Sequence, residues 1–177
     1  MESMEKQKML ALLERGRAAL LASLEGVSDE MAARSPGEGR WSIVGCVEHL
    51  GVSEDYLFSQ IVAATPSQTP LTNEKREAKM LAFGADRSRR IESPPEGHPK
   101  ATFRTLPEAV GHFLASRKRT VEFVETNRED LRAKVTWHPI LETANCHEML
   151  LSIGVHCLRH VNQIQEIKAE LGCAGKI

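Results

Sequence analysis

The segment 145–171 constrains the fold more than any other part of the chain. At about 100° per residue, His156, His160 and Gln163 fall in one narrow wedge of a helix. Apolar residues share or border that wedge: Met149, Ile153, Ile164, Ile167 and Leu171. The two histidines therefore point inward. A buried imidazole needs a partner for each nitrogen, and one cation can satisfy two histidines that lie one turn apart.

Three further segments carry apolar residues at helical spacing, which predicts amphipathic helices. They cover residues 5–25, 42–64 and 105–127. Gly26 ends the first, and Thr105-Leu106-Pro107-Glu108 is a capping-box start for the third. Thr143 or Asn145 is expected to cap the final helix, which should end before Gly172. Four helices and no convincing strand predict an all-α four-helix bundle, as a single domain over residues 1–177.

Residues 65–104 form a long connection between the second and third of these helices. A connection of this length is uncommon in a compact domain, so we interpret it as a crossover that lets the two helices run parallel, with a lid over a site as an added role. A short helix is expected from Glu74 to Phe83. The basic cluster Arg87, Arg89 and Arg90 is interpreted as a solvated loop.

Composition limits the function classes. The chain has 23 basic and 24 acidic residues, so net charge gives no sign of a nucleic-acid surface. No apolar run approaches membrane-spanning length, and the first residues lack the apolar core of a signal peptide. We therefore expect a soluble cytoplasmic protein with neither a nucleic-acid nor a membrane partner. Four scattered cysteines without a Cys-x-x-Cys pair predict reduced thiols: Cys46, Cys146, Cys157 and Cys173.

The final helix also carries a second apolar stripe, away from its histidine face. Its members are Leu151, Val155, Leu158 and Val161. This is more apolar surface than one bundle core can use. We predict a homodimer through the stripe, and the alternative is that the long connection folds over it.

His49 lies at the edge of the apolar stripe of the second helix. Its neighbours on that side are small or polar: Ser42, Gly45, Cys46, Ser53, Tyr56 and Gln60. Such a face leaves room for something other than packed side chains. Cys46 lies one turn from His49, but a free cysteine is more often a small apolar filler, so we do not assign it as a ligand.

A set of short motifs then resembles a known family. Trp41-Ser42 opens a helix that contains Glu48-His49-Leu50, and Trp137-His138-Pro139 precedes His156-x-x-x-His160-x-x-Gln163-Ile164. In order and spacing these resemble the DinB-like superfamily. The resemblance implies an up-up-down-down four-helix bundle, often dimeric, in which three histidines bind a divalent metal such as zinc or nickel. Carried over, the ligands are His49, His156 and His160. One departure is Leu141-Glu142, where relatives tend to place a glycine after the His-Pro pair.

The chemistry of such a site favours catalysis. Three histidines leave one coordination position of a cation open, and a water or thiol bound there loses its proton more easily. Some members of the superfamily are thiol-dependent enzymes, including bacillithiol S-transferases and mycothiol-dependent maleylpyruvate isomerases. The first functional hypothesis is therefore a metal-dependent transferase that acts on a small-molecule thiol and an electrophilic substrate. The alternative is a non-catalytic metal-binding stress or interaction protein.

Two further residues are candidates for contacts around the metal. Gln163 lies one turn beyond His160, and Tyr56 lies two turns beyond His49. Either side chain could orient a ligand or a bound water. The alternatives are a hydrogen bond from Gln163 to a backbone group, and a packed Tyr56 with its hydroxyl at the surface.

Overall fold

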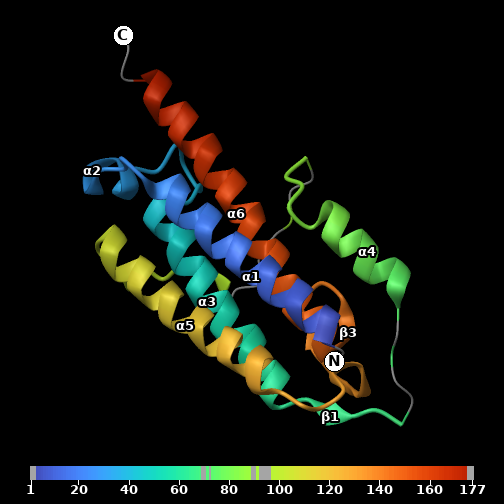
Figure 1. Cartoon of the computed structure of the whole chain (residues 1–177). Coiled ribbons are helices and arrows are strands. Elements are labelled where there is room, and N and C mark those ends of the chain that lie inside the picture. Colours follow the sequence, from blue (N-terminus) through green and yellow to red (C-terminus); the bar gives the residue numbers. More distant parts are fainter. Residues whose placement is uncertain (1–2, 69–70, 72, 89–90, 92–96, 175–177) are drawn as a thin grey trace.

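Four long helices dominate the structure, a computed structural model that describes residues 3–68, 71, 73–88, 91 and 97–174 (Figure 1). They are α1 Ser3–Leu24, α3 Ile43–Val62, α5 Leu106–Thr126 and α6 Cys146–Ala174. The predicted four-helix bundle is confirmed. Ser42 caps α3, and Thr105 with Glu108 forms the predicted capping box of α5. The end expected for the final helix is wrong, because α6 continues through Gly172 to Ala174.

The direction of the helices differs from the expected up-up-down-down order. α1 and α6 run one way, and α3 and α5 run the other way (Figure 1). The contacts that fix these directions are Leu12–Gly154 and Ser23–Lys168 between α1 and α6, Gly51–His112 and Phe58–Phe123 between α3 and α5, and Ile61–Cys146 and His49–His156 between α3 and α6. The long crossover makes α3 and α5 parallel, as predicted, whereas the two shorter connections each reverse the chain.

A small antiparallel sheet closes one end of the bundle, where no strand was expected. Its strands β1 Thr65–Pro66, β2 Lys134–His138 and β3 Glu142–Asn145 pair in the order β1-β2-β3. A turn at 139–141 joins β2 to β3, and Glu142 follows it with a φ of 60°. Strands of two to five residues are too short for an alternating pattern to be visible in the sequence. The short helix α2 Asp29–Ala33 lies in the connection between α1 and α3, and the 3₁₀ helix η2 Leu131–Ala133 lies between α5 and β2.

The long connection contains α4 Glu74–Phe83, with the bounds that the sequence predicted. Arg76 of α4 pairs with Glu148, which is fully buried near the start of α6, and Glu77 pairs with Arg132. Asn145 and Glu148 also cap α6 reciprocally, which confirms Asn145 as one of the two expected caps. α4 thus lies against the flank of α6 (Figure 1).

The second apolar stripe of α6 faces this segment. A Cβ added to Gly84 would lie 2.5 Å from Cγ2 of Val155, and Met80 of α4 and Leu158 of α6 pack on the same core cluster. The long connection therefore covers part of the stripe, which was the alternative to a homodimer; the homodimer stays a prediction.

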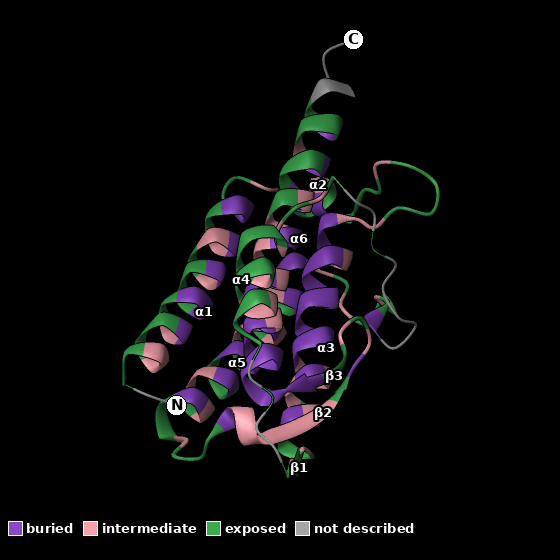
Figure 2. Ribbon diagram, turned by 90° about the vertical axis from the view of Figure 1, so that its right-hand side faces the viewer, coloured by how far each residue is buried: buried purple, intermediate pink, exposed green. Residues whose placement is uncertain are grey.

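The buried faces of the four helices turn toward one another (Figure 2). Within the described residues, no helix is both long and apolar enough to cross a membrane.

Candidate metal centre

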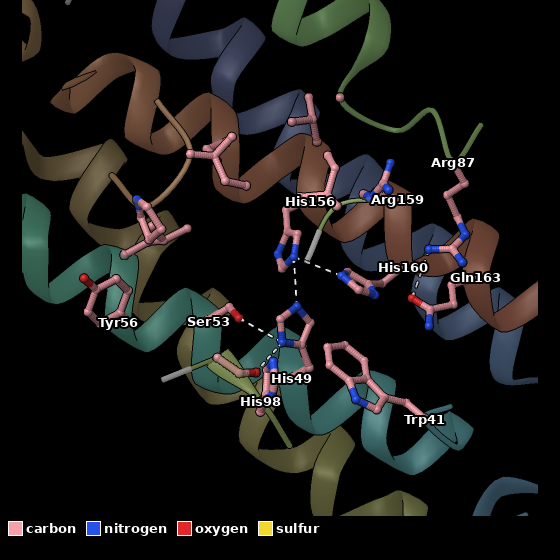
Figure 3. A pocket seen from close by; sticks show the side chains of 18 of the residues that line it. Trp41, His49, Ser53, Tyr56, Arg87, His98, His156, Arg159, His160 and Gln163 are labelled. Atoms are coloured by element: carbon pink, nitrogen blue, oxygen red, sulfur yellow. Dashed lines mark hydrogen bonds between the residues drawn. The ribbon is translucent and has the colours of Figure 1, made fainter. Parts of the chain in front are cut away.

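Three imidazoles from two antiparallel helices meet inside the bundle. His49 comes from α3, and His156 and His160 come from successive turns of α6 (Figure 3). The Nε2 atom of His156 lies 3.0 Å from Nε2 of His49 and 2.9 Å from Nε2 of His160. One ligand atom from each ring lies within 4.8 Å of the other two. The structure therefore brings together the three residues that the resemblance implied as ligands.

The proton on His49 is placed by its surroundings. Its Nδ1 faces the backbone carbonyl of Gly97, with the Ser53 hydroxyl at 3.2 Å. A carbonyl oxygen can only accept, so Nδ1 carries the hydrogen and Nε2 presents its lone pair to the other two rings. This is the tautomer that a metal-ligating histidine adopts when its outer nitrogen donates to a backbone carbonyl.

Burial keeps the three rings neutral. It lowers the pKa of His49 to about 4 and lowers the pKa of His156 and His160 well below the ordinary value. Repulsion from the other cluster rings adds to the effect at His156 and His160, and repulsion from His98 adds to it at His49. Neutral imidazole is the form that binds a metal ion. Nitrogens held about 2.0–2.1 Å from one cation stand about 2.8–3.4 Å apart at octahedral to tetrahedral angles. The His49–His156 and His156–His160 separations fall at the short end of that range, and all three donor atoms lie within 4.8 Å of one another. Three neutral imidazoles gathered in this way are a donor set suited to a divalent cation.

A buried glutamate next to His49 holds the segment that orients it. Oε1 of Glu48 accepts hydrogen bonds from the backbone N–H of Lys100 at 2.9 Å and of Thr102 at 3.1 Å, and the residue is only 1% exposed. These bonds tie the segment that begins at Gly97 to α3. Sequence reasoning did not predict this role, although a charged residue on the buried side of a helix was a signal for it.

Replacing Glu48 with alanine is expected to weaken zinc binding about tenfold, a typical cost when a residue that supports a metal ligand is lost. The reason is that two backbone N–H groups lose their acceptor and the Gly97 carbonyl is no longer held against His49. Isothermal titration of the metal-free protein with zinc measures the effect. Glu108→Ala is the matched control, because Glu108 also accepts two backbone N–H bonds but at the start of α5. Equal zinc affinity in the Glu48→Ala variant and the native protein would contradict this role.

A cavity of about 1040 Å³ opens onto the histidines. Its wall includes Trp41, whose ring centroid lies 4.6 Å from that of His49. Both additional candidates line it as well: Tyr56 from α3, and Gln163, whose Oε1 accepts from Arg87 at 3.1 Å (Figure 3). Their proposed role of orienting a ligand stays a prediction.

The cavity also contains residues that the sequence did not place. Arg87 was expected in a solvated loop but lies in the cavity wall, where its Nε contacts Glu166 at 2.9 Å. Arg89 and Arg90 of the same cluster lie outside the described residues. Arg159, His98 and His138 line the cavity too. Sequence spacing could not find these residues, because they reach the cavity through the long connection, the hairpin and a different face of α6.

No fourth protein ligand joins the three histidines among the described Cys, His, Asp and Glu side chains. Cys46 is fully buried, and burial raises the pKa of its thiol to about 12, as expected for an apolar filler. The other two described cysteines, Cys146 and Cys157, are also free and buried. A cation held by the three rings would therefore keep a coordination position facing the cavity.

Comparison with known proteins identifies a family model and a relative that each match most of the chain. The family model of the DinB superfamily matches residues 12–164. The uncharacterized protein YuaE of Bacillus subtilis (strain 168) is 22% identical over 162 residues, which cover 92% of this chain and 98% of YuaE.

Two solved structures share the fold. One is YfiT from Bacillus subtilis, described as "a probable metal-dependent hydrolase with an unusual four-helix bundle topology". It has a TM-score of 0.61 and 18% identity, and the match covers 97% of this chain and 90% of YfiT. The other is TT2238, described as a four-helix bundle protein. It has a TM-score of 0.59 and 20% identity, and the match covers 91% of this chain and 98% of TT2238.

Proposed function

Because this chain belongs to the DinB superfamily, we propose that it is a divalent-metal-dependent enzyme that joins a low-molecular-weight thiol to an electrophilic carbon, as an S-transferase or related isomerase. The observation that carries the proposal is the cavity of about 1040 Å³ that ends on three converging imidazoles. A structural metal site is closed by four protein ligands, whereas a catalytic site keeps an open position that substrate can reach.

His49, His156 and His160 would hold the metal, with zinc or nickel as the expected ion. A divalent cation held by them would lower the pKa of a thiol or water in the open position, which would make it a nucleophile at neutral pH. Gly97 and Glu48 keep His49 in its ligating tautomer. A cytoplasmic location and a homodimer remain predictions from the sequence.

The charge of the cavity wall favours an anionic substrate. Arg87 and Arg159 both line it, and Glu166 pairs with Arg87. Burial and repulsion from Arg87 lower the pKa of Arg159 even though Asp86 and Glu166 oppose the shift. A carboxylate between the two guanidinium groups would offset that repulsion and bind through charge-assisted hydrogen bonds. Trp41 and Tyr56 supply aromatic surface for the rest of the molecule. An acidic thiol fits this combination better than a neutral one.

Hydrolysis is the second candidate function. It is favoured by the description of YfiT as a probable metal-dependent hydrolase, since YfiT shares the fold. The same open position would then hold water in place of a thiol, and the electrophile would be an ester or amide carbonyl.

A nucleophile panel separates these functions. Zinc-loaded and nickel-loaded protein are assayed with glutathione or cysteine as the thiol and 1-chloro-2,4-dinitrobenzene as the electrophile. In this reaction a C–S bond forms, the C–Cl bond breaks, chloride leaves and the thiol proton goes to solvent. We expect thiol-dependent product formation at least tenfold above that of a His160→Ala variant. Hydrolysis of p-nitrophenyl acetate without thiol would favour the hydrolase. Stoichiometric metal with neither activity would favour the non-catalytic metal-binding protein.

A further inference from the structure

A histidine and a serine outside the metal cluster form a hydrogen-bonded pair in the cavity wall. His138 lies at the end of β2, and its Nε2 stands 2.8 Å from Oγ of Ser152 on α6. Ser152 precedes the candidate ligand His156 by one helical turn, and all three residues line the cavity. A serine and a histidine at this distance resemble a nucleophile with its general base.

The hydrogen bonds on the other side of the ring exclude that role. Nδ1 of His138 accepts the backbone N–H groups of Ile140 at 3.0 Å and Leu141 at 3.1 Å, in the turn between β2 and β3. A nitrogen that accepts two N–H groups carries no hydrogen, so the neutral ring has its proton on Nε2. Nε2–H therefore donates to Ser152, and the ring has no lone pair with which to take the serine proton. Burial also lowers the pKa of His138 to about 4, so the ring stays neutral near pH 7.

The remaining hydrogen of Ser152 is then available to a ligand. A helical serine commonly donates back to the carbonyl of the preceding turn. Within the described part of the chain, no acceptor is found for the Ser152 hydroxyl, while Ser23 and Ser59 each donate to such a carbonyl at 2.7 Å. Because Ser152 lines the cavity and accepts from His138, its hydroxyl is directed into the open space.

We propose that Ser152 donates a hydrogen bond to an oxygen of the electrophilic substrate, and that His138 is the positioning residue that keeps it a donor. The substrate class that fits is an electrophile with a carbonyl or carboxylate oxygen about one helical turn from the metal ligand His156. Negative charge that develops on this oxygen would strengthen the bond, and the Nε2–H to Oγ contact would polarise it further. The substrate part rests on the proposed function; the placement of the protons does not.

The placement of the protons is tested on the metal-free protein. Two-bond ¹H–¹⁵N correlation spectra are expected to show His138 as the Nε2–H tautomer at pH 7, and a fluorophosphonate probe is expected to leave Ser152 unmodified. A His138→Gln variant identifies the signals. An Nδ1–H tautomer, or labelling of Ser152, would overturn the proposal whether or not the protein binds a metal.

The donor role is tested with acetohydroxamate, which carries a metal-binding oxygen pair, on zinc-loaded protein. We expect Ser152→Ala to weaken acetohydroxamate binding about tenfold, which is the cost of losing one hydrogen bond to a charged group. Ser152→Thr should keep the acetohydroxamate affinity within about twofold, and neither variant should change the zinc affinity. The donor role would be overturned if acetohydroxamate bound the alanine variant and the native protein equally well, or if it bound neither zinc-loaded protein. Failure of the native protein to take up zinc would instead count against the proposed function.

Discussion

Replacing His160 with alanine is expected to abolish stoichiometric zinc or nickel binding at micromolar protein concentration. The Nε2 atom of His160 lies 2.9 Å from Nε2 of His156, and its Nδ1 is buried without a hydrogen-bond partner. Structural zinc sites with four ligands bind with roughly 10–16 kcal/mol, or about 3–4 kcal/mol per ligand. On that scale, losing one of the three ligands here should weaken binding on the order of a thousandfold. Elemental analysis after dialysis, together with zinc titration, measures the change.

His147→Ala is the matched control for this variant. His147 lies on the same helix, but it contacts Glu77 of α4 at 3.3 Å and takes no part in the cluster. The control should keep full metal content, and both variants should keep the helical circular dichroism of the native protein. Equal metal content in the His160→Ala variant and the native protein would end the case for this site.

The parts of the fold that depend on local sequence could be predicted. Helical periodicity and caps located the four helices and α4 to within a few residues, because a helix is specified by its own apolar spacing and end residues. The same spacing placed His156 and His160 on one inward face. That His49 joins them depends on how α3 and α6 pack, and the resemblance to a known family supplied this link.

The parts that depend on tertiary packing could not be predicted. The directions of the helices follow from where each connection returns, and β1 pairs with a strand seventy residues further along the chain, with Thr65 opposite Val135. Glu48 acts through backbone groups of a distant segment, and Arg87 reaches the cavity from the long connection. None of these contacts leaves a periodic signal in the sequence.

A second large effect is expected from Arg117, which joins three helices inside the bundle. It is 1% exposed, forms a bidentate pair with Glu54 of α3, and donates through Nη1 to the carbonyl of Leu13 in α1 at 2.6 Å. Burial opposes its charge, but the Glu54 carboxylate outweighs burial and raises its pKa. Arg117→Met would leave a buried carboxylate without a cation. We expect the free energy of unfolding to fall by about 3–5 kcal/mol, which urea denaturation of the metal-free protein measures.

Two further variants test whether the buried charge causes this loss. Arg119→Met removes the neighbouring arginine, whose pair with Asp55 is well exposed, and should cost less than about 1 kcal/mol. The double variant Glu54→Leu with Arg117→Met removes both charges and should recover most of the lost stability, because apolar side chains of similar volume replace a buried pair at little cost. Equal losses for Arg117→Met and Arg119→Met, or no recovery in the double variant, would show that packing rather than the isolated carboxylate sets the effect.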